Sequence, residues 1–282
     1  MTRLVADDYK HIPGMLPEFD LRLRRQTGLG LKDLAVHAAG VTEWPAGGTA
    51  GKTRVAAVTL TGGEGALDGF AEAVAAVADF LGADAFVTRA ADAAGLAEAY
   101  ESGAEIVMLA DDERFVAINL VTRRVSDNSQ LTGRAFATAL DLMAGGLRRR
   151  GALVLGCGPV GRSAAEALAG CGASVTVFDP EISRSRELVL RLRRISGAPV
   201  MAAESLRAAL SSHQYLLDAT PSGGFISGDV IDDRTLVAAP GVPCGVTTEA
   251  AALLGERLLY DPLCLGVAAM LMDAAGGEAA SP

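Results

Sequence analysis

Three glycines lie close together in the middle of the chain, in the sequence Gly156-Cys157-Gly158-Pro159-Val160-Gly161. The first glycine permits a tight turn, the second lets the backbone approach a pyrophosphate, and the third lets a helix pack closely on a strand. The N-terminus of that helix presents unpaired N–H groups that bind an anion. This spacing predicts a dinucleotide-binding turn whose cofactor contacts are Gly156, Gly158, Pro159, Val160 and Gly161.

The elements that such a turn needs surround it. An apolar run over 152–155 precedes it, a helix-like segment follows as far as Cys171, and a second apolar run over 174–178 ends at Asp179. An acid at the tip of the second strand can accept hydrogen bonds from an adenosine ribose, and it would repel the 2′-phosphate of NADP. Asp179 therefore favours NAD over NADP, and Asp179 and Pro180 are predicted cofactor-binding positions. A glycine turn that binds nothing would not need this context.

Arginines follow the predicted ribose contact, at positions 184, 186, 191, 193 and 194. Arg184 or Arg186 could reach a 2′-phosphate, which would favour NADP. A solvated helix face would carry the same residues without binding a phosphate.

Two later strands, predicted over 215–218 and 236–238, end in loops rich in proline and glycine. Backbone must come close to a nicotinamide ring without bulky side chains, and such residues allow it. Ordinary surface loops have the same composition. If the loops form the rim of a nicotinamide pocket, the predicted cofactor contacts in them are Ala219, Thr220, Pro221, Pro240, Gly241, Pro243 and Cys244.

The first half of the chain offers candidates at two further strand ends. Thr61 to Gly65 follow a predicted strand over 55–60, and Asp111 and Asp112 follow one over 105–109. Ligands of parallel sheets bind beyond the carboxyl ends of strands. A plain βα turn and a helix cap are the alternatives, since Asp in a first helical turn complements the helix dipole.

Strands alternate with helices along the chain, which favours an α/β fold with parallel sheets. We expect an N-terminal α/β domain over 1–132 and a Rossmann domain with a C-terminal helix over 133–282. The predicted helices are 5–27, 31–38, 66–82, 91–102, 133–147, 181–195, 204–211 and 266–273. Further strands are predicted over 85–87, 116–121 and 258–260, loops over 41–52 and 123–132, and a disordered tail over 274–282.

Composition limits the classes of function. The 282 residues are 50% hydrophobic, yet no apolar run reaches the ~20 residues of a membrane helix. A formal charge of −9 argues against nucleic acid and is compatible with a cationic substrate. Four scattered cysteines and three scattered histidines predict no metal site and a reducing cytoplasm. The lysines are Lys10, Lys32 and Lys52, so the second half has none.

Several stretches together resemble one family, the NAD-dependent pyrrolysine synthases (PylD). The likeness covers nearly the whole chain, and its most specific part is the first half. The matching stretches are Leu4, 24–28, 61–70, 108–112, Phe115, 119–120, 128–133, the glycine turn, 219–221, 240–244 and 261–270.

The resemblance implies a reaction and a set of site residues. The family's substrate is lysine that bears 3-methyl-D-ornithine on its side-chain nitrogen through an amide. Oxidation of the ornithine's terminal amine carbon releases ammonia, the other ornithine amine captures the aldehyde or imine, and loss of water closes a pyrroline ring. Asp111 is implied to accept a proton or hold the cationic chain, with Asp112 as a helix cap. The substrate-binding positions carried over are Leu4, Thr61, Gly62 and Asn128.

The chain departs from the family pattern at four places. Gly62 stands where a serine is expected, so a hydroxyl contact to the substrate is missing. The 41–54 segment is longer than the usual connection, and Cys157 and Pro159 are unusual in the glycine turn. The departure at Gly62 concerns amine binding more than the reaction.

Two other classes of protein fit part of the sequence. A shikimate- or methylenetetrahydrofolate-type dehydrogenase would need a lysine near its substrate, and Lys52 is the candidate. A non-catalytic NAD-sensing module would bind the cofactor without oxidising an amine. We expect a cytoplasmic amine dehydrogenase without metal that binds a small dipeptide-like amine between Asp111 and the nicotinamide loops. Two-domain dehydrogenases often form twofold dimers, so we also expect a homodimer.

Overall fold

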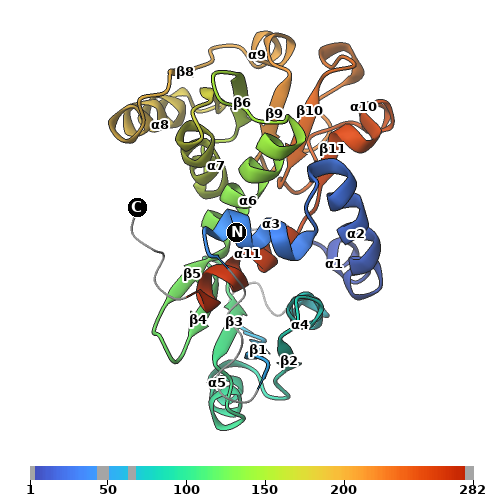
Figure 1. Ribbon diagram of the computed structural model, residues 1–282, viewed down its shortest axis with the longest axis vertical. Coiled ribbons are helices and arrows are strands. Elements are labelled where there is room, and N and C mark those ends of the chain that lie inside the picture. The colour runs from blue at the N-terminus through green and yellow to red at the C-terminus, as the bar shows by residue number, and fades with distance from the viewer. Residues whose placement is uncertain (1–3, 43–50, 63–67, 277–282) are drawn as a thin grey trace.

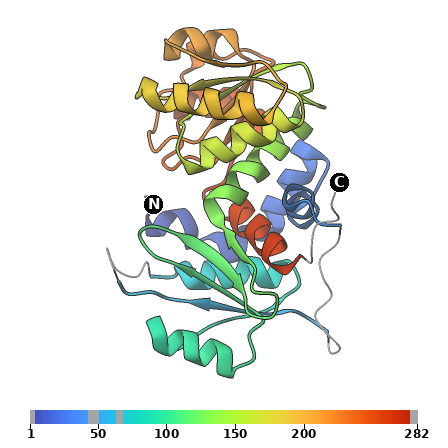
Figure 2. The same ribbon diagram turned by 90° about the vertical axis from the view of Figure 1, so that its left-hand side faces the viewer.

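The chain folds around two separate β-sheets with a layer of helices between them (Figures 1 and 2). The computed structural model describes residues 4–42, 51–62 and 68–276. The predicted α/β class with a parallel-sheet Rossmann unit is confirmed. In the described part of the chain, no helix is long and apolar enough to cross a membrane.

The first sheet is mixed and has the order β2-β1-β3-β4-β5. Its strands are β1 (Arg54–Val58), β2 (Asp84–Val87), β3 (Ile106–Ala110), β4 (Phe115–Asn119) and β5 (Val125–Asp127). Strands β1, β2 and β3 are parallel, whereas β4 runs antiparallel to both β3 and β5. The prediction of a parallel sheet is confirmed for β1, β2 and β3 and is wrong for β4. The reason is the four-residue connection 111–114, which is far too short for the crossover that parallel neighbours need.

The second sheet is parallel throughout and has the order β11-β10-β9-β6-β7-β8. Its strands are β6 (Gly151–Leu155), β7 (Ser174–Phe178), β8 (Val200–Ala202), β9 (Tyr215–Asp218), β10 (Leu236–Ala239) and β11 (Leu258–Tyr260). Its helices are α7 (Pro159–Gly170), α8 (Ile182–Ile195), α9 (Leu206–Ser212) and α10 (Thr248–Leu254). The sequence did not predict β8, a short edge strand.

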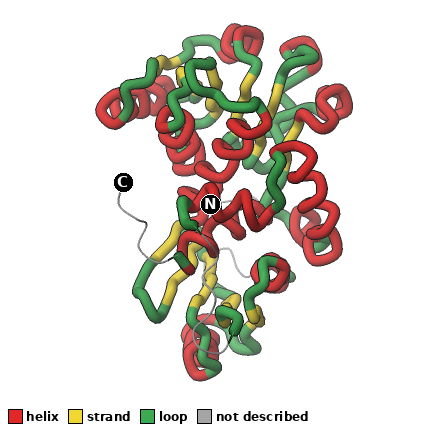
Figure 3. Tube along the Cα trace, in the orientation of Figure 1, coloured by secondary structure: helices red, strands yellow, loops and turns green. Residues whose placement is uncertain are grey.

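Helices fill the space between the sheets, as the red segments in the middle of Figure 3 show. They are α1 (Ala6–Tyr9), α2 (Ile12–Thr27), α3 (Leu31–Ala39), α6 (Asn128–Met143) and α11 (Cys264–Ala275), while α4 (Phe70–Phe80) and α5 (Asp92–Glu101) accompany the first sheet. All twelve residues of α11 are buried, and this C-terminal helix packs against α3 and α6. Two predictions are wrong at these places. Residues 123–132 contain β5 and the start of α6, and α11 continues through Ala274 and Ala275. Residues 277–282 lie outside the described part.

Helix α2 lies beside the edge of the second sheet at β11 (Figure 1). Arg22 donates to the carbonyl oxygen of Tyr260 over 3.2 Å, and Gln26 donates to that of Leu258 over 3.0 Å. Arg25 adds an exposed ion pair with Glu256 at 3.2 Å. The N-terminal part of the chain is thus fastened to the Rossmann sheet by side-chain bonds to backbone.

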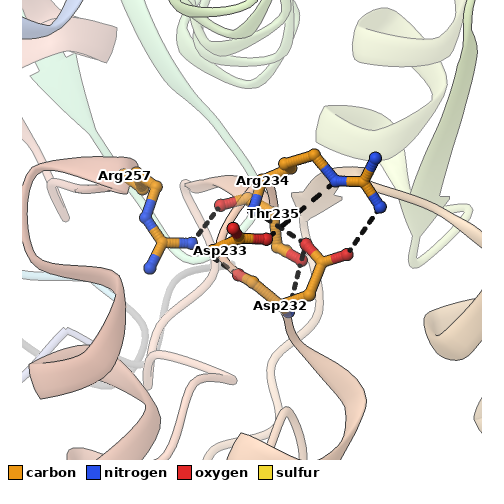
Figure 4. Close-up of polar contacts among 5 residues, drawn as sticks. All are labelled: Asp232, Asp233, Arg234, Thr235 and Arg257. Atoms are coloured by element: carbon orange, nitrogen blue, oxygen red, sulfur yellow. Dashed lines mark hydrogen bonds and ion pairs between the residues drawn. The ribbon is translucent and has the colours of Figure 1, made fainter.

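A polar cluster lies at the amino end of β10, beside the start of β11 (Figure 4). Asp232 accepts hydrogen bonds from the backbone N–H of Arg234 at 2.9 Å and the hydroxyl of Thr235 at 3.0 Å. Arg257 donates to the carbonyl oxygens of Asp232 at 2.6 Å and Thr235 at 3.2 Å. Because this cluster lies at the amino end of the strand, it stabilises the turn far from the predicted ligand edge.

The carboxyl edges of the two sheets meet at the start of α6. Strand β5 ends where α6 begins, and the antiparallel order β3-β4-β5 makes β1 and β3 run in the same direction as β5. The chain then returns through β6, whose carboxyl end leads into α7. Helices α6 and α7 touch there, since the Ser163 hydroxyl donates to the carbonyl oxygen of Gln130 over 2.5 Å. The fold thus brings the loops at the carboxyl ends of the strands of both sheets together.

Candidate active site

The glycine turn joins β6 to α7 in the geometry that the sequence predicted. Gly156 has φ 86°, a left-handed conformation that side chains rarely adopt, and a Cβ there would lie 2.8 Å from the carbonyl oxygen of Ala219. Gly158 caps α7, and Pro159 occupies the first helical position. Proline suits that position because its fixed φ is helical and its missing N–H has no helical partner there. Pro159 is therefore compatible with the turn.

The remaining space in this turn fits a dinucleotide. A Cβ on Gly161 would collide with the carbonyl oxygen of Gly156, so this glycine is required for close packing. A Cβ on Gly158 would meet no atom within 4 Å, which leaves open space in front of the N-terminus of α7. Backbone N–H groups and the helix dipole favour an anion in that space. The turn can therefore hold a pyrophosphate.

Asp179 lies at the end of β7, beside the glycine turn. One carboxylate oxygen accepts the backbone N–H of Cys157 at 2.9 Å and the other accepts that of Glu181 at 3.0 Å. Each carboxylate oxygen can accept a further bond, so ribose hydroxyls can still be bound. Cys157 itself is buried, and burial raises the pKa of its thiol. This cysteine fills space beneath the turn as a neutral thiol.

The two proline- and glycine-rich loops are fastened together by a carboxylate that the sequence analysis missed. Asp218, the last residue of β9, is fully buried and accepts the Thr220 hydroxyl at 2.7 Å and the Thr220 N–H at 3.0 Å. Its other oxygen accepts the N–H of Gly245 at 2.9 Å, directly after Cys244. Asp218 is the last residue of β9 and Asp179 directly follows β7, so an acid at the carboxyl end of a strand is the signal that could have found it.

Burial dominates the electrostatics of this carboxylate. Removal from water raises the pKa of Asp218 to about 6, although the bonds from Thr220 and Gly245 oppose the rise. Gly241 allows the loops to approach each other, since a Cβ there would lie 3.0 Å from the carbonyl oxygen of Asp218. The predicted rim residues, 219–221 and 240–244, are thus brought together around one buried acid.

Asp111 lies in the tight connection between β3 and β4. Its Oδ1 accepts the backbone N–H groups of Glu113 at 2.8 Å and Arg114 at 2.7 Å. The bond from Arg114 is the largest cause that lowers the pKa of the exposed Asp111 carboxyl, and the bond from Glu113 is the next. The alternative of a helix cap for Asp111 and Asp112 is wrong, because a β-hairpin follows.

Thr61 follows β1 at the same edge and is bound to a second acid that the sequence analysis missed. Asp92, at the start of α5, accepts the N–H of Thr61 at 2.8 Å and also its hydroxyl. The Thr61 hydroxyl is the largest cause that lowers the pKa of Asp92. Asp92 has φ 53°, which is unusual outside glycine. Its role depends on a contact 31 positions away, which no local pattern reveals.

Two buried polar atoms without partners lie where α6 meets α11. Asn128 Oδ1 and Thr132 Oγ1 have no hydrogen-bond partner in the described structure. Both face Gly266, where a Cβ would lie 3.0 Å from Asn128 Oδ1 and would overlap Thr132 Oγ1. Buried polar groups are nearly always satisfied in native proteins, so an orphaned pair suggests a bound water or ligand.

The other predicted substrate positions differ in surroundings. Leu4 is 8% exposed and belongs to the hydrophobic core, whereas Gly62 is exposed with open space around its Cα. Residues 43–50 of the long 41–54 segment and Gly63, Glu64 and Gly65 of the glycine-rich loop lie outside the described part. A cavity of about 610 Å³ lies on a different face of α6 from Asn128, lined by His37, Arg124, Arg134 and Asp273 among others.

The comparisons with known families and proteins agree with this geometry. Residues 6–126 match the model for the N-terminal domain of the pyrrolysine biosynthesis protein PylD, and residues 143–239 match a putative NAD(P)-binding family. Pyrrolysine synthase from Methanosarcina acetivorans is 30% identical over 96% of this chain and 98% of that relative. The Methanosarcina barkeri protein of the same name is 28% identical over 96% and 97%.

Solved dehydrogenases resemble the fold. Quinate dehydrogenase from Corynebacterium glutamicum in complex with NAD has a TM-score of 0.54 at 15% identity, covering 79% of this chain and 92% of that chain. Shikimate dehydrogenase from Aquifex aeolicus has a TM-score of 0.51 at 13% identity, covering 76% and 88%. At such identities the likeness concerns the fold alone. Together with the NAD(P)-binding family match, the glycine turn confirms the predicted cofactor, NAD.

Proposed function

Because this chain belongs to the family of pyrrolysine synthases, the PylD proteins, we propose that it performs the ring-closing oxidation of pyrrolysine biosynthesis. The substrate in this proposal is L-lysine whose side-chain nitrogen bears 3-methyl-D-ornithine through an amide. The carbon of the terminal ornithine amine is oxidised, ammonia leaves, and the second amine closes the pyrroline ring. The family and the NAD-binding domain make the chain an oxidoreductase of this biosynthesis.

The meeting of two carboxyl edges is the observation that carries the proposal. The first sheet contributes Thr61 and Asp111 at its edge, and the second contributes the glycine turn and the two nicotinamide loops. Bound NAD supplies the hydride acceptor at the second edge. The first edge then has to bind and orient an amine, and two strand-end carboxylates, Asp92 and Asp111, suit a cationic chain.

We assign the binding of the substrate's terminal amine to Asp111. Its Oδ1 is occupied by the hairpin N–H groups, and its Oδ2 has no hydrogen-bond partner in the described structure. The lowered pKa keeps the carboxylate charged at neutral pH, so holding an ammonium suits it better than taking up a proton. Orientation is the larger need, because the cyclisation requires two amines and one carbon in contact.

The orphaned atoms of Asn128 and Thr132 support a polar group of the substrate at the start of α6. The substrate proposed here carries an amide and two amines, and an amine or amide N–H can donate to both oxygens. This assignment gives Asn128, predicted as a substrate contact, a defined partner atom. It adds Thr132, which the sequence analysis did not name.

A dehydrogenase that uses a lysine is the second candidate function, because the fold neighbours include quinate and shikimate dehydrogenases. Its candidate Lys52 is exposed and lies before β1. That is the amino end of the strand, whereas Thr61 and Asp111 lie at the carboxyl edge. The position of Lys52 therefore favours the amine dehydrogenase.

A direct assay tests the proposal. Purified protein, NAD and lysine-N6-(3-methyl-D-ornithine) should produce NADH, followed near about 340 nm. The product should be lighter than the substrate by one ammonia and two hydrogens. The control substrate replaces the ornithine by norvaline, which lacks the terminal amine, and should give no NADH. NADH formed with hydroxy acids and not with the amine would contradict the proposal.

Replacement of Thr61 by Val should raise the KM for the amine about tenfold and change kcat little. The valine removes the hydroxyl that holds Asp92, a loss worth about one hydrogen bond to a charged group. Steady-state kinetics with varied amine would measure it. Thr122→Val is the matched control, because Thr122 is exposed on the β4–β5 turn at the opposite edge. A similar rise in KM in the control would refute the assigned role.

The proposal also includes a homodimer in the cytoplasm. Sedimentation of the purified protein would decide the oligomeric state.

A further inference from the structure

The segment after β7 folds back onto the glycine turn and carries a second acid. Asp179 binds the N–H of Cys157 with one oxygen and that of Glu181 with the other. Glu181 is the residue that caps the N-terminus of α8, two positions beyond the carboxylate assigned to the adenosine ribose. The backbone of Glu181 is therefore bound directly to the carboxylate assigned to the ribose.

Both carboxylate oxygens of Glu181 accept a hydrogen bond from a neighbouring side chain. Its Oε2 accepts the Nε–H of Arg184 at 2.6 Å, and its Oε1 accepts the hydroxyl of Ser183 at 2.9 Å. Arg184 lies in the first turn of α8. The next residue, Ser185, lies with its Oγ 3.7 Å from the Sγ of the buried Cys157 beneath the glycine turn, so this turn of α8 adjoins the cofactor site.

A guanidinium at this place is the usual partner of a 2′-phosphate. NADP differs from NAD by that phosphate, which an arginine binds through charge-assisted, bidentate hydrogen bonds. Arg186, the other candidate from the sequence, lies about 200° around the helix from Arg184, so the two cannot face the ribose together. Arg184 is the better placed of the two, and Glu181 holds it.

We propose that Glu181 makes this chain selective for NAD against NADP by neutralising Arg184, which would otherwise bind the 2′-phosphate. Selection of this kind does not require Asp179 alone to reject the phosphate. The inference rests on the dinucleotide-binding part of the proposed function and is independent of the amine substrate. Because Glu181 and Arg184 are both more than half exposed, their pair contributes little to folding and can be removed without unfolding the protein.

Equilibrium binding tests the proposal without any amine. The dissociation constants of NADH and NADPH are measured by titrating the protein and following nucleotide fluorescence. The wild type should bind NADH more tightly than NADPH. Glu181→Ala should tighten NADPH binding about tenfold, the gain from one charge-assisted hydrogen bond, and change NADH binding less than about threefold.

Two further variants separate the causes. In Glu181→Ala/Arg184→Ala the gain for NADPH should disappear, because the released guanidinium is gone. Glu166→Ala breaks a matched surface pair, in which Arg191 Nε lies 2.5 Å from Glu166 on α7, and should leave both constants unchanged. An unchanged ratio in Glu181→Ala, or a gain that survives in the double variant, would overturn the proposal. Failure of the amine assay would leave these results untouched, so the two proposals can fail separately.

Discussion

Replacement of Asp111 by Asn is expected to lower kcat/KM for the amine about 100-fold while NADH binding stays unchanged. The size follows from the loss of one charge-assisted contact, which is worth up to about 3 kcal/mol. Asparagine can still accept the N–H groups of Glu113 and Arg114 through its Oδ1, so the hairpin turn is preserved. Only the negative charge is removed.

Steady-state kinetics and a fluorescence titration with NADH would measure the two quantities. Glu113→Gln is the matched control, because it removes the same charge from an exposed residue two positions away. The control should retain kcat/KM within about threefold, since screening by water and salt weakens the effect of an exposed charge. Wild-type kcat/KM in Asp111→Asn, or an equal loss in the control, would remove Asp111 from the site.

The pH dependence separates the two roles that a carboxylate could have. The backbone bonds hold the pKa of Asp111 below its usual range, so the carboxylate stays charged as the pH falls through 5. If Asp111 holds the cationic chain, the acid limb of the pH profile of kcat/KM reflects the ionisation of the substrate amine and not that of the Asp111 carboxyl. The same acid limb should then remain in the residual activity of Asp111→Asn.

The nucleotide half could be predicted well because its signals are local. The glycine spacing, the strand before it and the acid at Asp179 lie within one βαβ unit, and each residue has a steric or electrostatic requirement. The comparisons confirm the family that the sequence resembles. The positions of the site residues follow from strand ends, which periodicity locates to within a few residues.

Contacts between distant segments could not be predicted. Asp92 meets Thr61 across 31 positions and Asp218 meets Gly245 across 27, and neither pair leaves a sequence pattern. The apolar composition of residues 266–273 predicted a helix without showing what covers it. Its packing on α3 and α6 consists of tertiary contacts, which have no local sequence pattern.

One local error had a signal in the sequence, and a second had none. Helix α6 begins at Asn128 because the Asp127 side chain caps it, accepting from the N–H groups of Ser129 and Gln130. An Asp followed by polar residues is a common helix start, so the loop prediction over 123–132 is wrong at a place where the sequence contains a helix signal. Strand β8 was missed for a different reason: with three residues, it is too short for an alternating pattern to be visible.

The buried acid beneath the nicotinamide loops should make stability fall as the pH rises. The folded protein raises the pKa of Asp218 from 3.8 to about 6. Between those values the folded state holds a proton that the unfolded state has released, so the contribution is complete below the lower value and is lost as the pH passes the upper one. The loss amounts to about 3 kcal/mol of unfolding free energy.

Replacement of Asp218 by Asn should therefore flatten the pH dependence of stability between about pH 4 and pH 7 by that amount. Urea unfolding at several pH values would measure the difference in slope between variant and wild type. Asp229→Asn is the control: the hydroxyl of Ser227 lowers the pKa of Asp229, so that carboxyl is ionised in both states over this range and its removal should leave the slope unchanged. If the unfolding free energy of Asp218→Asn and of the wild type changed with pH in parallel, burial of the Asp218 carboxylate would not destabilise the folded protein. A flattened slope would mean that the buried charge of Asp218 lowers the stability of the protein at neutral pH. The same carboxylate binds Thr220 and Gly245, and so holds together the two loops that line the cofactor site.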